Sequence, residues 1–597
     1  MKTSLLIANG DSDASGTLTN CESDCSQNRT KLTSNQSEDC LIKNSLNYSD
    51  SDKSHWNMQK FDVNEFEDEE KFVYKKNLPK SYYIFKEFMM TERTAVFDLK
   101  ILAQNFQRLF LKHTLMSTRT FSELFSTIQP LYVFHRDLLN DLEIKMKNWE
   151  NSQIIANGCF GSDHFRTGEL FLCSVHNALH YHRDLIQQAP IFLAAIDELN
   201  RTNKSFCNSY RSMQDEDYCY LPINCLFLKA VFRMILGRIV AAFLEEGGDS
   251  DGTTQLSSSR VALEKIASFN RESKIIRESL VNFVKMVELQ SYLTEVEGLI
   301  HPKRKFVREG WIFKWTKRGL IPHILILFND SILFAHRSSS GFSVDGIHDL
   351  RGMTITDGDL FHLTSDPTTC ITIHAYNQPI ILSANSTNSK EIWKEELSNM
   401  IEQVKKCKIE QLPKSITTSS FAKSDDTGFY EDFVDSRKNS STNNVAIEQE
   451  NVARKKRNSK TNVSQICWYR QSTLMMSSLI KAPINQISGY LLRKLRTSTG
   501  WQKLWVVHAN FTLFFYKSHQ DLSPLAILPL IDYYISLPSL NDEIDRENVF
   551  KLSYKTHFYF LATDSFYSLS RWVETIREST LNANRCDILA SLLSYRL

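Results

Sequence analysis

The sequence predicts a multidomain protein in which an elongated all-α helical bundle precedes two β-barrel modules, each capped by a C-terminal helix. Apolar residues first recur every three or four positions, and near Pro302 the period changes to two. The second pattern then occurs twice, which indicates an internal duplication. With 19 Gly and 13 Pro in 597 residues, helix breakers are scarce.

The helical bundle is predicted over residues 78–300. The stripe of its first helix passes through Phe85, Met89, Val96 and Leu99. The last helix has no Gly or Pro between Val261 and Val296 and should reach roughly 40 residues, or about 60 Å. Further helices are expected at 121–149, 168–187, 192–212 and 221–245, the last of these apolar nearly all round.

The two β modules are predicted at 304–408 and 485–583. Each ends in one amphipathic helix that carries a Trp, and we expect Trp393 and Trp572 to plug the barrels as core residues. The remaining stretches are rich in Ser, Thr and Asn, or short, and cannot bury enough apolar surface to fold. They are a disordered segment with an acidic end, a disordered linker and a tail, at 1–77, 409–484 and 584–597.

Composition excludes several classes of function. A net charge of +1 removes bulk attraction to nucleic acid, and no apolar run is long enough to span a membrane. The 12 Cys form no CxxC pair, and there is no Walker loop and no HExxH motif. We therefore expect a cytoplasmic protein without metal, cofactor or nucleic-acid partner.

Several stretches resemble the FERM, RhoGEF and pleckstrin domain-containing proteins, in which a Dbl-homology domain precedes two pleckstrin-homology domains. They include YYIFKEFMMTERTAVFDL at 82–99, CYLPINCLFLKAVFR at 219–233, LFNDSILF at 327–334 and SGYLLRKLRTSTGWQKLWVVHANFTLFFYKSHQD at 488–521. That family usually begins with a FERM domain. The segment 1–77 is too short and too polar for one, so we expect none here.

The resemblance implies a guanine nucleotide exchange factor for a Rho-family GTPase, most plausibly Rac or Cdc42. Such a factor makes and breaks no bonds, so it is not an enzyme in the chemical sense. It binds the nucleotide-free GTPase better than the loaded one. The pleckstrin modules are then expected to provide autoinhibition and attachment to the plasma membrane or cytoskeleton.

The best candidate contact to the GTPase is Glu92, which falls where the family's first helix carries a Glu. From the residues alone, a carboxylate that interrupts an apolar stripe is a charge at the rim or a paired structural glutamate. The resemblance also assigns contacts to Lys229 and Arg233 on the central helix, with solvated charges as the alternative. Leu236 and Lys274 stand where the family often has a basic residue and an Asn.

These departures leave a second function open. Leu236 cannot donate a hydrogen bond to the GTPase, and Gly237 weakens the helix. The alternative is a non-catalytic scaffold that keeps the architecture and has lost part or all of the exchange activity.

Phosphoinositide binding in pleckstrin modules typically uses basic residues on the first two strands. The first module offers few of these and the second more, although Leu504 replaces a usual Arg. We expect weak attraction to anionic lipids from the second module and little from the first. The candidates are Lys314, Lys317 and Arg318, then Arg493, Lys494, Arg496 and Lys503.

Overall fold

The fold was obtained as a computed structural model. It describes residue 78 and the ranges 80–155, 167–233, 254–294, 296–338, 341–358, 366–375, 379–406, 417–418, 462–495 and 500–581. Every described residue belongs to the same compact unit of the chain. The segment 1–77, predicted to be disordered, and the tail at 584–597 lie outside the described residues.

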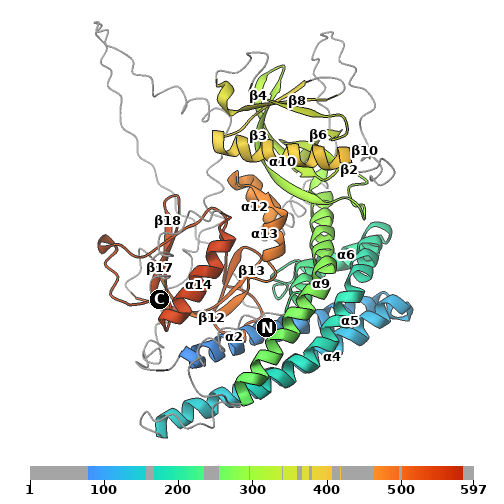
Figure 1. Cartoon of the computed structure of the whole chain (residues 1–597). Coiled ribbons are helices and arrows are strands. Elements are labelled where there is room, and N and C mark those ends of the chain that lie inside the picture. Colours follow the sequence, from blue (N-terminus) through green and yellow to red (C-terminus); the bar gives the residue numbers. More distant parts are fainter. Residues whose placement is uncertain are drawn as a thin grey trace, which may run out of the picture. The chain divides into compact units, whose positions relative to one another are not determined.

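The helical part begins with α2 (Lys80–Lys100), which a π-helical segment (Ile101–Phe106) joins to α3 (Gln107–Lys112). The longest helix, α9 (Thr254–Tyr292), has 39 residues and confirms the predicted uninterrupted helix. It runs beside α5, as Figure 1 shows. The remaining helices are α4 (Arg119–Ile155), α5 (Thr167–Thr202), α6 (Lys204–Gln214) and α7 (Ile223–Val231).

One predicted helix boundary is wrong. The sequence suggested separate helices at 168–187 and 192–212, but α5 continues through Pro190 to Thr202. Proline costs the helix one hydrogen bond without stopping it here. The break falls at Asn203 instead, because its side chain accepts a hydrogen bond from the backbone of Phe206 (3.0 Å) and caps α6.

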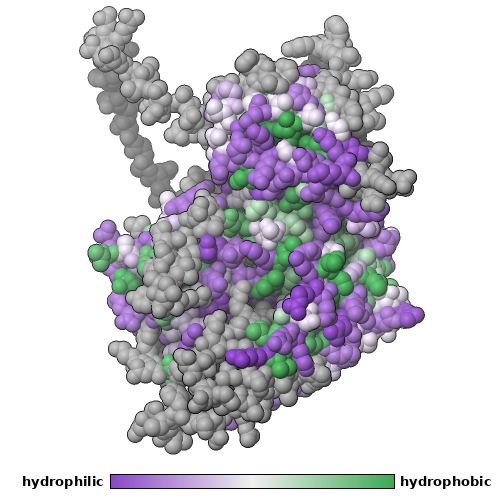
Figure 2. Space-filling view, viewed as in Figure 1, coloured by the Kyte–Doolittle hydropathy of each residue, from purple (hydrophilic) through white to green (hydrophobic). Residues whose placement is uncertain are grey.

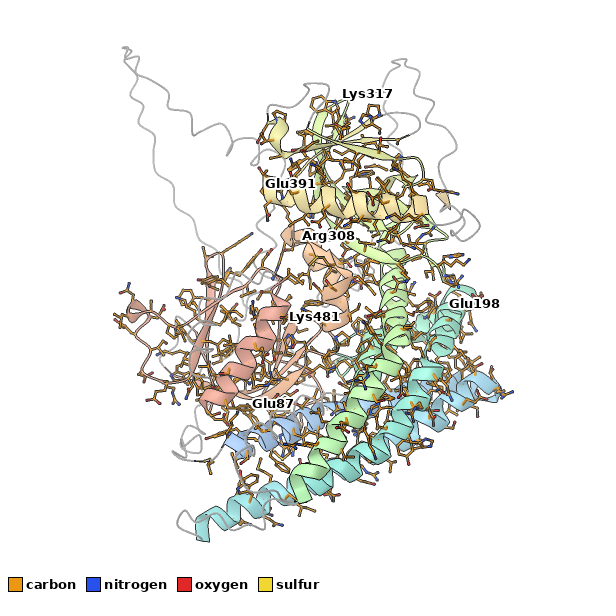
Figure 3. The ribbon with its side chains drawn as sticks, viewed as in Figure 1. Glu87, Glu198, Arg308, Lys317, Glu391 and Lys481 are labelled. Carbon is orange, nitrogen blue, oxygen red and sulfur yellow. The ribbon has the colours of Figure 1, made fainter. Side chains whose placement is uncertain are left out.

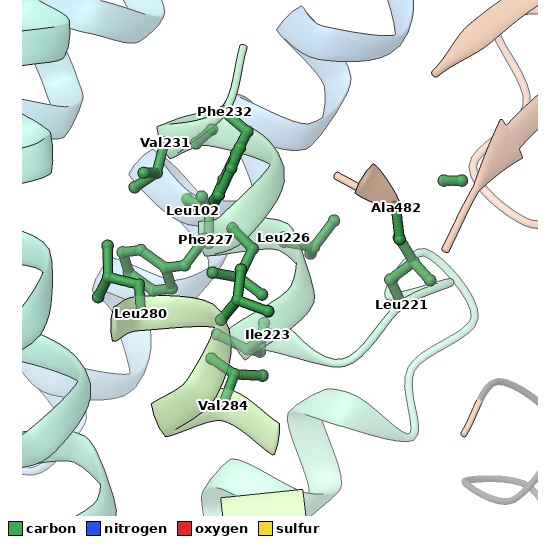
Figure 4. Packing of buried hydrophobic residues seen from close by; sticks show 14 of the residues in the cluster. Leu102, Leu221, Ile223, Leu226, Phe227, Val231, Phe232, Leu280, Val284 and Ala482 are labelled. Carbon is green, nitrogen blue, oxygen red and sulfur yellow. The ribbon is translucent and has the colours of Figure 1, made fainter. Parts of the chain in front are cut away.

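The short helix α7 lies at the centre of the hydrophobic core. Figure 4 shows Phe227 of this helix beside Leu280 of α9 and Ile223 beside Val284 of α9, with Leu102 close by. This confirms that the central apolar segment is buried. The helix was predicted over 221–245, and residues 234–253 lie outside the described part of the chain.

The first β module is an antiparallel sheet covered by one helix. The helix α10 (Thr387–Lys406) buries Trp393 and presents a hydrophilic outer face (Figures 1 and 2). The sheet order is β6-β5-β4-β3-β9-β8-β7, with a parallel extension by β1 (Leu293–Thr294). Its strands are β3 (Phe306–Thr316), β4 (Gly319–Phe328), β5 (Ser331–Ser338), β6 (Gly341–Asp349), β7 (Thr354–Asp357), β8 (Cys370–His374) and β9 (Pro379–Ser383). The pair β2 (Val296–Glu297) and β10 (Thr417–Thr418) lies outside this sheet.

The second β module repeats the same plan. Seven strands pair in the order β15-β14-β13-β12-β18-β17-β16, and α14 (Phe566–Ser579) closes the module with Trp572 buried. The prediction that Trp393 and Trp572 are core residues is thus confirmed. The strands are β12 (Ile487–Leu495), β13 (Gln502–Ala509), β14 (Thr512–Tyr516), β15 (Ala526–Pro529), β16 (Tyr534–Ser536), β17 (Val549–Tyr554) and β18 (His557–Ala562).

The predicted disordered linker is wrong in its last part. Residues 462–481 form α12 (Val463–Arg470), β11 (Leu474–Met475) and α13 (Met476–Lys481). Strand β11 pairs with β3, and the Trp468 ring is fully buried against Phe342. Arg470 donates to the backbone oxygens of Pro529 and Ile531 in the second module. We call this segment the strap, because it contacts both β modules.

A buried ion pair ties the strap to the helical part. Lys285 of α9 donates to Glu309 of β3 at 2.7 Å and also to the hydroxyl of Ser464 in the strap. Burial raises the pKa of Glu309, and the ammonium of Lys285 opposes this effect. Removing one partner would therefore leave a buried charge without compensation.

We expect Lys285→Met to lower the free energy of unfolding by about 3–5 kcal/mol, because Glu309 is then buried and unpaired. The double variant Lys285→Met/Glu309→Met should recover most of the loss. Urea denaturation followed by circular dichroism measures both, and Lys274→Met, at an exposed lysine of the same helix, serves as the control. A double variant as unstable as the single one would show that charge pairing is not the cause.

Candidate functional site

One polar stripe on α2 is buried although its residues are hydrophilic. Glu87, Thr91, Thr94 and Asp98 are spaced by four, three and four positions, so they share one face of the helix. None of the four is more than 8% exposed. We call these four residues the polar face of α2. Buried polar groups need hydrogen-bond partners. The elements that cover this face supply such partners.

Glu87, the first residue of the polar face, is bound by α14 of the second β module. Glu87, labelled in Figure 3, accepts two hydrogen bonds from the Nε of Arg571 (3.1 Å to each oxygen) and one from its Nη2 (2.9 Å). The hydroxyl of Tyr567 donates to Glu87 Oε2 at 2.8 Å. Beside them, Lys86 pairs with Asp564 at 2.6 Å. Burial lowers the pKa of Arg571, but the Glu87 carboxylate more than reverses this and raises it.

Further along α2, the same module makes a second set of contacts. Thr94 donates to the hydroxyl of Ser488 on β12 at 2.7 Å. Asp98 pairs with Lys229 of α7 at 2.5 Å and accepts a hydrogen bond from Tyr220 at 2.7 Å. The Tyr220 ring meets Phe514 of β14 edge-on, with centroids 4.8 Å apart. The second β module therefore contacts both α2 and Tyr220, which precedes α7 (Ile223–Val231).

Glu92 lies on the adjacent face of α2, in a buried cluster of charged and histidine side chains. Its carboxylate contacts His135 Nδ1 at 2.6 Å and Arg233 Nη2 at 2.7 Å. The Nε2 atoms of His135 and His182 are 3.2 Å apart. The Glu92 side chain is 2% exposed. This is the paired structural glutamate that the residues alone left open.

The electrostatics of this cluster fix its protonation. Burial alone would raise the pKa of Glu92, but Arg233 and His135 together lower it to about 2. Burial lowers the pKa of His135 despite the neighbouring carboxylate, and the pKa of His182 falls well below its usual range for the same reason. Neutral His135 then donates from Nδ1 to Glu92 and accepts at Nε2 from His182.

The other predicted GTPase contacts occupy contrasting positions. Arg233 and Lys229 are both buried and paired, with Glu92 and Asp98 respectively. Burial lowers the pKa of Lys229, and Asp98 opposes the shift. Lys274 is exposed on α9 and is not part of the cluster. Leu236 lies outside the described residues.

The candidate lipid-binding residues of the first module lie on the β3–β4 hairpin. Lys317, labelled in Figure 3, and Arg318 are exposed in its turn. Lys314 is half-buried above the Phe334 ring, and burial lowers its pKa. Two of the three candidates are therefore exposed to solvent.

The candidates of the second module are more enclosed. Arg493 is buried, donates to Gln502 at 2.7 Å, and has its pKa lowered by burial to about 10. Lys494 lies over the Trp501 ring and Lys503 over the Tyr490 ring. Arg496 is outside the described residues. The attraction of this module to anionic lipids remains a prediction.

Sequence reasoning missed the polar face of α2 and its partners on α14. Polar residues recur at 87, 91, 94 and 98 with the same helical spacing as the apolar stripe, which is the local signal that was available. Glu87 and Arg571, however, are 484 positions apart, and no local pattern reports such a pairing. Among the described residues, no group of three or more His, Cys, Asp or Glu could hold a metal ion.

Comparison with known proteins assigns the helical part and the second module. The model described as RhoGEF domain matches residues 84–235, and the model described as PH domain matches residues 485–580. FERM, ARHGEF and pleckstrin domain-containing protein 2 of Mus musculus is 33% identical over 528 residues, which cover 85% of this chain and 47% of that protein. This chain is related to the FERM, ARHGEF and pleckstrin domain-containing proteins.

Two further curated relatives are similar over a comparable length. Protein 2 of Homo sapiens is 34% identical over 519 residues, with 85% of this chain and 47% of that protein covered. Protein 1 of Gallus gallus is 31% identical over 535 residues, covering 88% and 49%. The crystal structure of the DH domain of FARP2 is 26% identical, covers 35% of this chain and 96% of that chain, and has a TM-score of 0.31.

The chain spans about half the length of the curated relatives that it matches. In the terms of these matches, α2 and α7 belong to the RhoGEF domain and Arg571 to the PH domain. On the polar face of α2, the contacts of Glu87 with Arg571 and of Thr94 with Ser488 therefore join the RhoGEF domain to the PH domain, whereas those of Asp98 lie within the RhoGEF domain. No helix within the described ranges has the length and apolar character that crossing a membrane requires.

Proposed function

We propose that the chain is a guanine nucleotide exchange factor for a Rho-family GTPase, with Rac or Cdc42 as the expected substrates. The observation that carries the proposal is the RhoGEF match over residues 84–235, which contains Glu92, Lys229 and Arg233. The chemistry is non-covalent. A surface that binds the nucleotide-free GTPase more tightly than the loaded one shifts the population toward nucleotide loss.

We further propose that the PH domain blocks the GTPase-binding surface on α2 and α7. The proposal is supported by the contacts of the PH domain with the polar face of α2, where Glu87 binds Arg571 and Thr94 binds Ser488 instead of solvent. A GTPase that approaches α2 and α7 must first displace the module. The interaction free energy of the covering contacts therefore adds to the barrier for GTPase binding.

A second role of the PH domain would be weak attachment to anionic lipids. Lys494 and Lys503 lie over aromatic rings with part of each side chain accessible. A lysine attracts a lipid phosphate as a point charge, without the two-pronged geometry of arginine. The attachment is therefore expected to be weak and poorly selective, and it would recruit a cytoplasmic protein to a membrane surface.

The alternative function is a scaffold without exchange activity. It is favoured by the state of Glu92, whose two carboxylate oxygens are already occupied by His135 and Arg233. A glutamate committed to the domain interior is not available to a partner unless Arg233 moves. The two functions predict different rates of nucleotide release.

The test is release of a fluorescent guanine nucleotide from Rac and Cdc42 in the presence of the intact chain. We expect slow acceleration by the wild-type chain. Glu92→Gln, which keeps the size and removes the charge, should abolish the acceleration, whereas Arg136→Ala, at an exposed arginine of α4, should not change it. If no Rho-family GTPase responds, even to a variant in which the PH domain is detached, the chain is a scaffold.

A further inference from the structure

The contact between α14 and α2 contains a tyrosine whose hydroxyl is placed between two opposite charges. Tyr567 lies in the first turn of α14, two positions after the N-cap Ser565. Its hydroxyl donates to Glu87, and Arg571, four positions later on the same face, binds the same carboxylate. Burial raises the pKa of Tyr567 and the Glu87 carboxylate raises it further, so the hydroxyl stays protonated as a donor.

A phosphate on this hydroxyl would reverse the sign of the contact. The phosphotyrosine would bring a charge of about −1.5 to −2 to the place where a neutral donor now faces Glu87. Two like charges at a buried contact repel by several kcal/mol. Arg571 would also gain a better partner on its own helix, because arginine binds phosphate in a two-pronged geometry.

The same modification would leave the second β module folded. Tyr567 is in the first turn of a 14-residue helix, where the helix dipole favours a negative charge. On the opposing helix, Lys86, which is next to Glu87 in sequence, is already paired with Asp564 at 2.6 Å. The phosphate would thus be stabilised within α14 and repelled across the interface.

From this geometry we propose that Tyr567 is a phosphorylation site that detaches the second β module from α2. A tyrosine kinase transfers the terminal phosphoryl group of ATP to the Tyr567 hydroxyl oxygen, the hydroxyl proton leaves to the kinase, and ADP is released. The hydroxyl is covered in the docked state, so the kinase acts on the fraction of molecules in which the module has opened. The product cannot dock again, and the population shifts to the open state.

The consequence for nucleotide release rests on the proposed function, but the detachment itself does not. The experiment therefore measures docking. The intact chain is treated with a tyrosine kinase catalytic domain and ATP, the modified positions are located by mass spectrometry, and amide hydrogen exchange is followed in α2 and α14. Tyr567→Phe removes the acceptor oxygen, and Tyr469→Phe, at a tyrosine that is 48% exposed, is the matched control.

We expect Tyr567 to be phosphorylated and the amides of α2 to exchange about tenfold faster or more, with the strands of the second β module unchanged. Kinase treatment should leave exchange in Tyr567→Phe unaltered and act on Tyr469→Phe as on wild type. Phosphorylated Tyr567 with unchanged or slower exchange in α2 would overturn the proposal. So would failure to phosphorylate Tyr567 in Arg571→Ala, where the contact is weakened. Detachment without faster nucleotide release would leave this inference standing and contradict the proposed function.

Discussion

Arg571→Ala is expected to detach the PH domain from α2. The substitution removes three hydrogen bonds to Glu87 and leaves this carboxylate buried without its cation, a loss of about 3–5 kcal/mol for a buried pair. We expect this loss to exceed the free energy that holds the PH domain on α2. The domain should then dissociate from α2 and expose Glu87 to water. Hydrogen exchange in the intact chain should then show faster exchange along α2 and undiminished protection in β12 and β13.

The control for this prediction is Arg136→Ala, because Arg136 is an exposed arginine of α4 whose pair with Asp137 is accessible to water. Exposed pairs contribute about 0–1 kcal/mol, so this variant should exchange as the wild type does. Unchanged protection of α2 in Arg571→Ala would mean that the remaining contacts, such as the Thr94–Ser488 hydrogen bond, suffice to hold the module.

Glu92→Ala is expected to destabilise the RhoGEF domain more than any surface substitution. Arg233 and His135 would lose their shared acceptor while remaining buried, and an uncompensated buried guanidinium costs about 3–5 kcal/mol. Glu92→Gln keeps the volume and one acceptor oxygen, so its loss should be smaller. Urea denaturation of both variants at pH 7 measures the difference. Equal stability of Glu92→Ala and wild type would contradict the buried network.

The same carboxylate gives the domain a specific dependence on pH. The pKa of Glu92 is about 2 in the folded state against 4.5 unperturbed, so the unfolded state binds the proton more readily. The stabilisation, about 3 kcal/mol, is complete above pH 4.5 and is lost as the pH falls toward 2. Between pH 6 and 3 the wild type should lose stability faster than Glu92→Gln, which has no carboxylate to titrate at this position.

Local sequence patterns predicted those features that depend on residues within one helix or strand. The length of α9 followed from the absence of Gly and Pro between Val261 and Val296, and the burial of Trp393 followed from its place inside an amphipathic helix. The burial of Glu92 was one of two alternatives, because its interruption of an apolar stripe is visible in the sequence. Its partners His135 and His182, from α4 and α5, were not predictable from that stripe.

The strap and the covered face of α2 could not be predicted in this way. Residues 462–481 form short elements that contact α9, β3 and the second module, all distant in sequence, so no periodic stripe develops. Polar Ser and Asn dominate the composition around them and indicated a linker. The Glu87–Arg571 pair depends on two separate domains meeting, which no helical or strand period encodes.

The central claim is that the contact between Glu87 and Arg571 keeps the exchange surface closed. It is tested most directly by exchanging the two charges and measuring nucleotide release from Rac and Cdc42 by the intact chain. Glu87→Arg and Arg571→Glu should each accelerate release, because like charges then face each other across the interface. The double variant restores opposite charges and should return to the slow rate of the wild type. Equal rates for all four proteins, or a double variant as fast as the single ones, would contradict the claim.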